Sequence, residues 1–479
     1  MTAKRPIPVL AIAAVAAGVL IAAPTAGAAS ITVTSSADVS GNDGACTLRE
    51  AVRAATTNTA SGAMAGECAA GELANADSIG FAPAVVGQTI AVDSPVGGSP
   101  GELDGGGPVV LDGCSSQASP SQPCVGLRPN SFNIHALLVN AEDVTIRGLA
   151  ITNSTAAITG LVGSVGMKVA NNWLGLTVGG DAELVGTGVT VIGDGTVVGG
   201  GGGGERNVFA AAAIGVEVFV ADDARVSGNV FGLQEDGSTP APGNVGVVLS
   251  SNGLDGPQGT VIGGDTAAEE NLISNAAFAG VAVSDDVGIE DNRFLRNRGS
   301  GNGTLFIDLC NDLAAGNPCG VQEGVEAPAI ASSGPNAAAG AAAPGAVVRL
   351  YRKASASPGE VQGFLGQATA DGSGNWTVTH NAGLPDGTRV TANQTTTSGN
   401  SSEMAAAVAT VVPPPAIAPP AIAPIAGPPA GEDPACADLR DRLAKAKRSL
   451  KKAQRQDRPT KKKRRKVRRL SGELSALGC

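Results

Sequence analysis

Aromatic and histidine side chains are scarce in this chain of 479 residues: aromatic residues make up 3% of it, and His occurs twice, at His135 and His380. Sites that bind sugars or stack nucleic-acid bases usually offer aromatic ring faces, so the composition disfavours both kinds of site. No Cys-X-X-Cys pair occurs, and with two His residues the chain gives little basis for a zinc site.

Long apolar runs are also rare. One lies at residues 9–23, after Lys4 and Arg5, and an Ala-X-Ala sequence ending at Ala28 follows it. This order is typical of a secretory signal peptide, predicted here over residues 1–28. The alternative is a membrane anchor, which needs about 20 apolar residues, more than this run offers. We therefore expect an exported protein with no transmembrane span after the signal peptide is removed.

Charge is modest, at 16% of residues, and it is unevenly distributed. Residues 436–479 contain 17 Lys and Arg against four Asp and Glu, a net charge of +13, which leaves −23 for the rest of the chain. The chain is thus an acidic body with a basic tail, and this division is more informative than the overall net charge of −10.

Residues 144–307 repeat themselves. TVVGGGGGGERNVFAAAAIGVEVFV (196–220) and TVIGGDTAAEENLISNAAFAGVAVS (260–284) share Thr-Val, Gly-Gly, Glu, Asn, an apolar pair and Gly-Val in the same order. A second phrase recurs as NNWLGLTVGGDAELVGTG from Asn171 and GNVFGLQEDGSTPAPGN from Gly228. Repeats of this size predict a stacked architecture, because a single unit cannot bury its apolar face alone.

The repeating units predict strands, since they are short β-branched runs separated by Gly, Asn and Asp. We interpret residues 76–325 as a parallel β-helix; an ordinary β-sandwich would leave the repeats unexplained. Asn suits the turns and, stacked in register, can also hydrogen-bond to its counterparts; the recurring positions are Asn153, Asn172, Asn207, Asn229, Asn271 and Asn292. These phrases resemble those of the right-handed parallel β-helix family of bacterial secreted proteins.

The segment CTLREAVRAATTNT from Cys46 predicts a capped helix. Thr47 and Glu50 form a capping box, and apolar residues follow on one helical face. Such a helix before a solenoid would cover its open end. Residues 29–75 resemble the CSLREA-type N-terminal domain of secreted bacterial β-helix proteins, with Thr47 where Ser is usual; the resemblance implies export and architecture without an assigned reaction.

The eight Cys residues of an exported protein predict disulfides. Their spacing suggests pairing of nearest neighbours, in the couples Cys46 and Cys68, Cys114 and Cys124, Cys310 and Cys319, and Cys436 and Cys479.

The β-helix resemblance raises the question of catalysis, because members of that fold often cleave polysaccharides with clustered carboxylates or with Asp-bound Ca²⁺. Asp222, Asp223, Asp285 and Asp286 are the candidate carboxylates, as acid and base or as Ca²⁺ ligands. Both pairs directly follow a repeated strand, where a polar turn is needed in any case, and we favour the turn. No other cofactor is implied.

Other candidate ligand-binding residues in the solenoid are few. Arg293, Arg296 and Arg298 are either a site for a carboxylated glycan or solvated charge near the last coil. Trp173 and Phe231 hold the same place in the second repeated phrase, which predicts that both stack in the core.

Residues 326–412 predict a second module. The runs VVRLYRKA from Val347, GFLGQATA from Gly363, NWTVTHN from Asn375 and TRVTANQTT from Thr388 alternate like half-buried antiparallel strands. The segment resembles the bacterial Ig-like β-sandwich modules that follow such solenoids, which implies a spacer or adhesion role. Residues 413–434 are rich in Pro and predict an extended linker.

Residues 435–479 predict an antiparallel helical hairpin, a short coiled coil, because apolar residues recur at steps of three and four on both sides of a turn at Arg458. Folding there places Leu443 opposite Leu474 and Ala446 opposite Leu470. The alternative is a disordered basic tail. The concentration of basic residues in the second half of this hairpin predicts an anion-binding site at Lys461, Lys462, Lys463, Arg464, Arg465, Lys466, Arg468 and Arg469.

Together these features predict a secreted cell-surface structural or binding protein, attached through its basic tail to an anionic cell-envelope polymer or surface glycan. The alternative is an extracellular polysaccharide lyase or glycoside hydrolase of the parallel β-helix type.

Overall fold

The computed structural model describes residues 28–73, 75–92, 99–117, 122–312, 315–317, 319–405, 409–410, 434–454 and 461–476. The predicted signal peptide up to residue 27, most of the Pro-rich linker and Cys479 lie outside these ranges. The chain forms two compact units, Met1–Pro414 and Pro415–Cys479. Among the described helices, none is long and apolar enough to cross a membrane.

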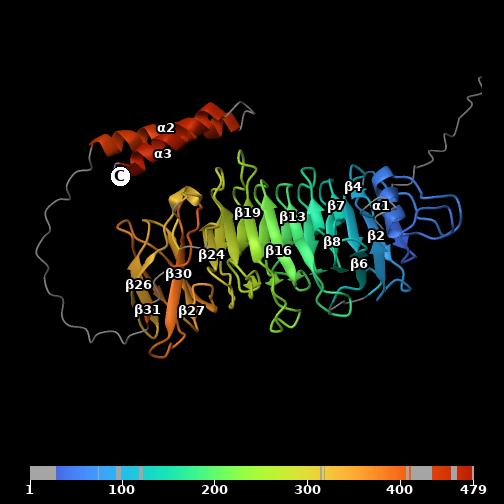
Figure 1. Ribbon diagram of the computed structural model, residues 1–479, viewed down its shortest axis with the longest axis horizontal. Helices are drawn as coiled ribbons and strands as arrows, with labels where there is room; N and C mark the ends of the chain where they lie inside the picture. Colours follow the sequence, from blue (N-terminus) through green and yellow to red (C-terminus); the bar gives the residue numbers. More distant parts are fainter. Residues whose placement is uncertain are drawn as a thin grey trace, which may run out of the picture. The chain divides into compact units, whose positions relative to one another are not determined.

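Three parallel sheets form the body of the first unit (Figure 1). In stacking order, sheet 1 contains β1 (Ser30–Val33), β2 (Asp77–Phe81), β5 (Val109–Asp112), β8 (Thr145–Arg147), β11 (Lys168–Ala170), β14 (Val197–Gly199), β17 (Arg225–Ser227), β20 (Val261–Gly263) and β23 (Arg293–Leu295). Sheet 2 contains β3 (Thr89–Val92), β6 (Val125–Pro129), β9 (Leu149–Ile151), β12 (Trp173–Leu174), β15 (Val208–Phe209), β18 (Val230–Phe231) and β21 (Leu272–Ile273). Sheet 3 contains β4 (Glu102–Leu103), β7 (His135–Val139), β10 (Ala156–Gly160), β13 (Val185–Val191), β16 (Ala212–Phe219), β19 (Val245–Ser250), β22 (Val281–Ser284) and β24 (Ile307–Cys310).

The predicted parallel β-helix is therefore confirmed. From β2 to β22 each coil passes through sheets 1, 2 and 3 in turn, and the first repeated phrase is the coil β14–β15–β16. Its second copy is β20–β21–β22, two coils further along the stack. The copies keep the same register because Val198, Val226 and Ile262 pair in sequence on sheet 1 and are fully buried. The sequence repeats because each successive coil places an apolar side chain at the same buried position.

The recurring Asn residues form a buried ladder at the turn between sheets 1 and 2. The side-chain amide of each donates to Oδ1 of the next, over 2.9–3.3 Å. The same amides also bond backbone carbonyls, such as that of Val198 with Asn229. The ladder consists of Asn172, Asn207, Asn229, Asn271 and Asn297.

The two remaining predicted Asn positions have other roles. Asn153 has the left-handed φ of 52° that suits a turn, and Asn292 accepts the backbone amide of Thr260 at 2.9 Å. The last rung of the ladder is Asn297, which the repeat pattern did not identify.

The predicted equivalence of Trp173 and Phe231 is wrong. Register places Trp173 in one column with Val208 and Val230, whereas Phe231 follows Leu174 and Phe209. Trp173 packs outside the coil, against a small apolar cluster that includes Leu176 and Ala241 from two loop excursions. The repeated phrase has the same register, because aligning Asn172 with Asn229 places Trp173 with Val230 and Leu174 with Phe231.

Phe209 and Phe231 stack inside the solenoid, with ring centroids 4.5 Å apart and planes 6° from parallel. Glycines of the neighbouring strands provide the space. A Cβ at Gly188 would lie 2.5 Å from the Phe209 ring, and one at Gly215 would lie 2.5 Å from the Phe231 ring. The large side chains and the glycines are therefore one packing arrangement.

Both ends of the stacked sheets are covered (Figure 1). At one end lies α1 (Leu48–Thr57), where the predicted capping box of Thr47 and Glu50 is present. Its apolar face, which includes Leu48 and Val52, is buried in the main core. At the other end lies the antiparallel module, with one sheet of β25 (Ala329–Ser333), β26 (Ala337–Ala341) and β29 (Asn375–Thr379), and another of β28 (Gly363–Thr369), β27 (Val347–Lys353), β30 (Arg389–Thr395) and β31 (Ala409–Thr410).

The second unit contains α2 (Pro434–Gln454) and α3 (Lys461–Ala476). Leu439, Ala446 and Leu470 are buried together, with Leu443 and Val467 packed against them. The predicted helical hairpin is confirmed, including the pairing of Ala446 with Leu470 across one apolar seam.

Disulfides join Cys46 to Cys68, Cys114 to Cys124 and Cys310 to Cys319. The side chains of the fourth couple, Cys436 and Cys479, lie outside the described residues.

Candidate functional site

The first candidate carboxylate pair lies in a stack of turns between sheets 3 and 1. The backbone amide of Asp222 donates to Asp194 Oδ1 at 2.9 Å, and Asp222 Oδ1 accepts the backbone amide of Gln258 at 2.9 Å. The neighbouring Asp223 has a left-handed φ of 57°, and its backbone amide bonds the Gln258 carbonyl. The Asp222 carboxylate and the Asp223 backbone amide thus connect their turn to the turn of the next coil, which is the structural role that the sequence favoured.

Asp222 nevertheless has an unusual electrostatic environment. The residue is exposed, but its carboxyl is partly enclosed between neighbouring turns, and this partial burial raises the pKa of Asp222 to about 6. The carboxylates of Asp194, Asp223 and Asp255 act in the same direction. A carboxyl with such a pKa could donate a proton near neutral pH.

The second pair, Asp285 and Asp286, lies in a bend after β22. Asp285 is exposed, and the backbone amide of Asp286 bonds the Ser284 carbonyl at 2.8 Å. Over the described part of the chain, no group of three or more His, Cys, Asp or Glu side chains could hold a metal ion. The structure therefore does not bring the two Asp pairs together into one carboxylate site.

The three candidate arginines near the last coil have different surroundings. Arg296 places its guanidinium 4.2 Å from the centre of the Phe364 ring, a cation–π contact. Arg298 forms an ion pair with Glu270, and Arg293 is exposed on sheet 1. Two of the three thus have structural contacts that the sequence did not reveal.

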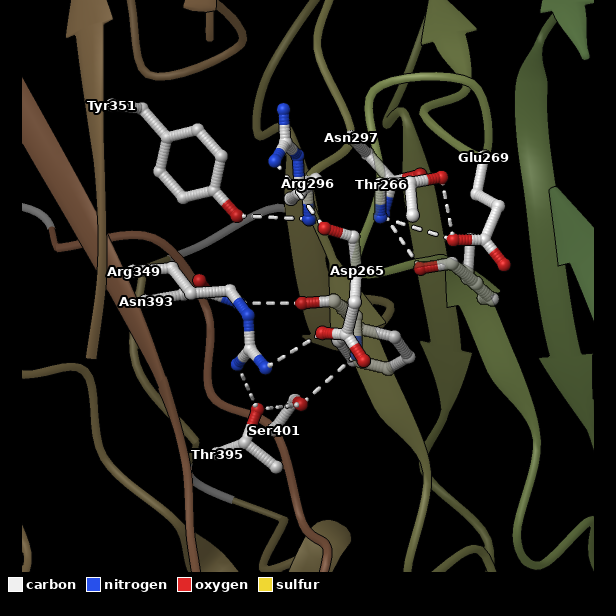
Figure 2. A network of polar contacts seen from close by, with 12 residues as sticks. Asp265, Thr266, Glu269, Arg296, Asn297, Arg349, Tyr351, Asn393, Thr395 and Ser401 are labelled. Atoms are coloured by element: carbon white, nitrogen blue, oxygen red, sulfur yellow. Dashed lines mark hydrogen bonds and ion pairs between the residues drawn. The ribbon is translucent and has the colours of Figure 1, made fainter. Parts of the chain in front are cut away.

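Polar contacts connect the last coil to the antiparallel module, as Figure 2 shows. The hydroxyl of Tyr351 on β27 accepts the backbone amide of Arg296 at 3.1 Å. Burial raises the pKa of Tyr351 to about 12, so the phenol stays neutral. Arg349, which is 6% exposed, donates to Thr395 Oγ1 at 2.9 Å and lies 3.8 Å from Asp265.

Side chains of the module also form hydrogen bonds with backbone groups at the open edge of sheet 1. Ser401 Oγ accepts the backbone amide of Phe294 at 2.9 Å, and Asn393 Nδ2 donates to the Phe294 carbonyl at 3.0 Å. Phe294 belongs to β23, the last strand of that sheet. A strand edge left open would expose unpaired backbone groups, so the module closes the solenoid. The main core continues into it through Tyr351 and Val361.

Glu403 reaches from the module into the last coil. It is 3% exposed, and its carboxylate accepts the backbone amides of Leu309 at 2.9 Å and Gly316 at 2.7 Å. Burial raises the pKa of Glu403 to about 7, and the carboxylates of Asp308 and Asp312 act in the same direction. The segment that it holds is closed by the disulfide between Cys310 and Cys319.

The basic residues of the second unit surround the apolar seam of the hairpin. In α3 the candidate anion-binding residues with described side chains are exposed: Lys462, Arg465, Lys466, Arg468 and Arg469. Side chains of Lys461, Lys463 and Arg464 lie outside the description. Exposed cations also occur on α2, among them Lys445, Arg448, Lys451 and Lys452. The hairpin thus combines a small apolar seam with a surface of concentrated positive charge.

No family model matches the chain, and no curated protein matches it. The catalytic domain of a GH87 alpha-1,3-glucanase in complex with nigerose is similar at 12% identity and a TM-score of 0.19, over 50% of this chain and 62% of that one. Full-length tailspike protein 2 from Escherichia coli O157:H7 bacteriophage CAB120 is similar at 10% identity and a TM-score of 0.17, over 67% of this chain and 57% of that one. The chain spans less than two thirds of either protein, and similarity at this level says nothing about its activity.

Proposed function

We propose that the protein is exported and acts at the cell surface as a structural or binding protein, held to an anionic polymer of the envelope by the hairpin α2–α3. The observation that carries the proposal is the burial of Leu470 and Ala446 in one seam, which leaves the neighbouring cations exposed. A preformed cationic surface attracts a polyanion without base or sugar recognition. The predicted signal peptide and the three disulfides support export.

The β-helix and its two caps would serve as the rigid body of such a protein. Of its candidate catalytic carboxylates, Asp222 accepts the backbone amide of Gln258 in the neighbouring turn, which is a structural contact. The antiparallel module, whose sequence resembles an Ig-like domain, contacts the last coil closely enough to act as its cap. Residues 29–75, similar to a CSLREA-type domain, would cap the first coil.

Retention on immobilised wall teichoic acid tests the attachment. We expect the full chain without residues 1–28 to bind at low ionic strength and to elute in ~1 M salt, where the Debye length falls to about 3 Å. Arg465→Gln combined with Arg468→Gln should lower the eluting salt concentration. Arg225→Gln combined with Arg293→Gln is the matched control, since it removes two exposed arginines from sheet 1. Equal elution of both variants would contradict the proposal.

A glycan-cleaving enzyme is the second candidate, and the observation that favours it is the raised pKa of Asp222, about 6. That carboxyl would be the proton donor in cleavage of a uronate glycan. The test is a screen of uronate glycans for new reducing or unsaturated ends, with and without Ca²⁺. Activity lost in Asp222→Asn and kept in Asp285→Asn would support the enzyme; no activity on any glycan would reject it.

A further inference from the structure

A cavity of about 530 Å³ lies at the junction of the solenoid and the antiparallel module. Its walls come from the segment that follows the last coil, from the end of β26 and from the turn after β30. The size is within the range of about 300–1,000 Å³ that is common for small-molecule sites and is too large for a single ion.

The lining has one sign of charge. It contains the carboxylates Glu323 and Glu326, both exposed, and no Lys or Arg among its described residues. Thr396 and Ser398 line the same space, and its apolar residues are alanines, at Ala327, Ala329, Ala341, Ala342 and Ala343. An anionic ligand would meet only repulsion there, whereas an aliphatic cation would find both carboxylates and methyl groups.

The walls are held in place by hydrogen bonds between distant segments. Gln394 donates from Nε2 to the Glu326 carbonyl at 2.6 Å and accepts the backbone amide of Ala343 at 2.8 Å. Glu323 Oε2 accepts Asn400 Nδ2 and Ser398 Oγ, each at 3.2 Å. The carboxylate of Glu323 is therefore positioned before any ligand arrives, which lowers the ordering cost of binding.

We propose that this cavity binds a linear aliphatic amine, with its ammonium group between Glu323 and Glu326 and its methylene chain on the alanines. A divalent cation fits less well, because among the residues that the structure describes no third acidic side chain joins these two carboxylates to complete a metal group. The amine could be a free diamine or the side chain of a peptide lysine, since both present the same stem and charge. This site is independent of the basic hairpin, which binds the opposite charge.

Calorimetry on the full chain without residues 1–28 tests the proposal with two probes, cadaverine and N-acetyl-lysine methylamide. Weak, saturable binding of at least one is expected, and the tighter probe identifies the source of the amine. 1,5-Pentanediol, which keeps the chain length and lacks the charge, should not bind. Because the ligand bridges two modules of one folded unit, saturating amine should also raise the melting temperature.

Glu326→Gln should weaken amine binding by about threefold to fivefold, which corresponds to an exposed ion pair. The matched control is Glu235→Gln, an exposed glutamate in a loop excursion of the solenoid, which should leave binding unchanged. Ala329→Trp, a change at an exposed rim position, should block the cavity and abolish binding. No heat with either amine, equal binding of the diol, or equal loss in both glutamate variants would overturn the proposal. None of these results depends on retention by the hairpin.

Discussion

Asn207 is bonded twice to Asn229 on the next coil: Oδ1 of Asn229 accepts both the backbone amide of Asn207 at 3.1 Å and its side-chain amide at 3.0 Å. Both residues are at most 1% exposed. Each rung therefore stabilises the stack mainly because breaking it leaves buried polar groups unsatisfied.

Replacing Asn229 with Ala should therefore destabilise the protein strongly. The change removes the acceptor of the Asn207 backbone amide, one of the two bonds of its side-chain amide and a donor to the Val198 carbonyl, at a cost of about 3 kcal/mol or more. The measurement is the melting temperature, with Asn133→Ala as the control because Asn133 is exposed. A similar small shift for both variants would contradict the buried role of the ladder.

A methyl group at Gly215 should also be destabilising. Its Cβ would lie 2.5 Å from the Phe231 ring and 2.4 Å from the Gly246 carbonyl, so Gly215→Ala overpacks the core by about 1–3 kcal/mol. Gly203→Ala is the matched control, since nothing lies within 4 Å of a Cβ there. The measurement is the melting temperature of both variants. A fall for Gly215→Ala alone would show that this glycine is needed to make room for the Phe231 ring.

The repeats predicted the solenoid because each copy refills the same buried positions, such as Val198 and Ile262. The hairpin was predictable for a related reason, since Ala446 and Leu470 belong to patterns that match when the chain reverses. In the antiparallel module the alternating runs identified β27, β28, β29 and β30. Each of these signals is local or periodic.

Features made by distant segments escaped prediction. The alanine-rich strand β26 has low intrinsic preference for a strand, and it forms because β25 and β29 pair with it on both sides. Tyr351 and Arg296 have no shared pattern in the sequence, yet they meet across the junction. The proposed amine site has the same origin, because its two carboxylates and its hydroxyl groups come from segments about 70 residues apart.

The cap of α1 gives a third prediction. Thr47 Oγ1 accepts the backbone amide of Glu50 at 3.3 Å and donates to the Val39 carbonyl at 2.7 Å. Thr47→Ala should lower stability by about 1 kcal/mol or more, because the buried backbone amide of Glu50 and the Val39 carbonyl both lose their partner. Thr57→Ala, at the exposed end of the same helix, should change the melting temperature little. An unchanged melting temperature for Thr47→Ala would argue against the cap.

Glu403 predicts a pH dependence of the junction. Burial raises its pKa from an ordinary 4.5 to about 7, so the folded protein holds this proton more tightly than the unfolded chain does. The resulting stabilisation is fully present below about pH 4.5 and is lost as the pH rises through 7. We expect the melting temperature to fall between pH 5 and about pH 8 in the wild-type chain.

Glu403→Gln tests this assignment, because the amide cannot ionise and keeps one oxygen, which can accept the backbone amide of either Leu309 or Gly316. The variant should reduce the fall in melting temperature over that interval. Asp222→Asn is the necessary comparison, since the raised pKa of Asp222 acts in the same direction at about pH 6. A fall of unchanged size in Glu403→Gln, together with its disappearance in Asp222→Asn, would assign the pH dependence to the turns of the solenoid instead of the junction.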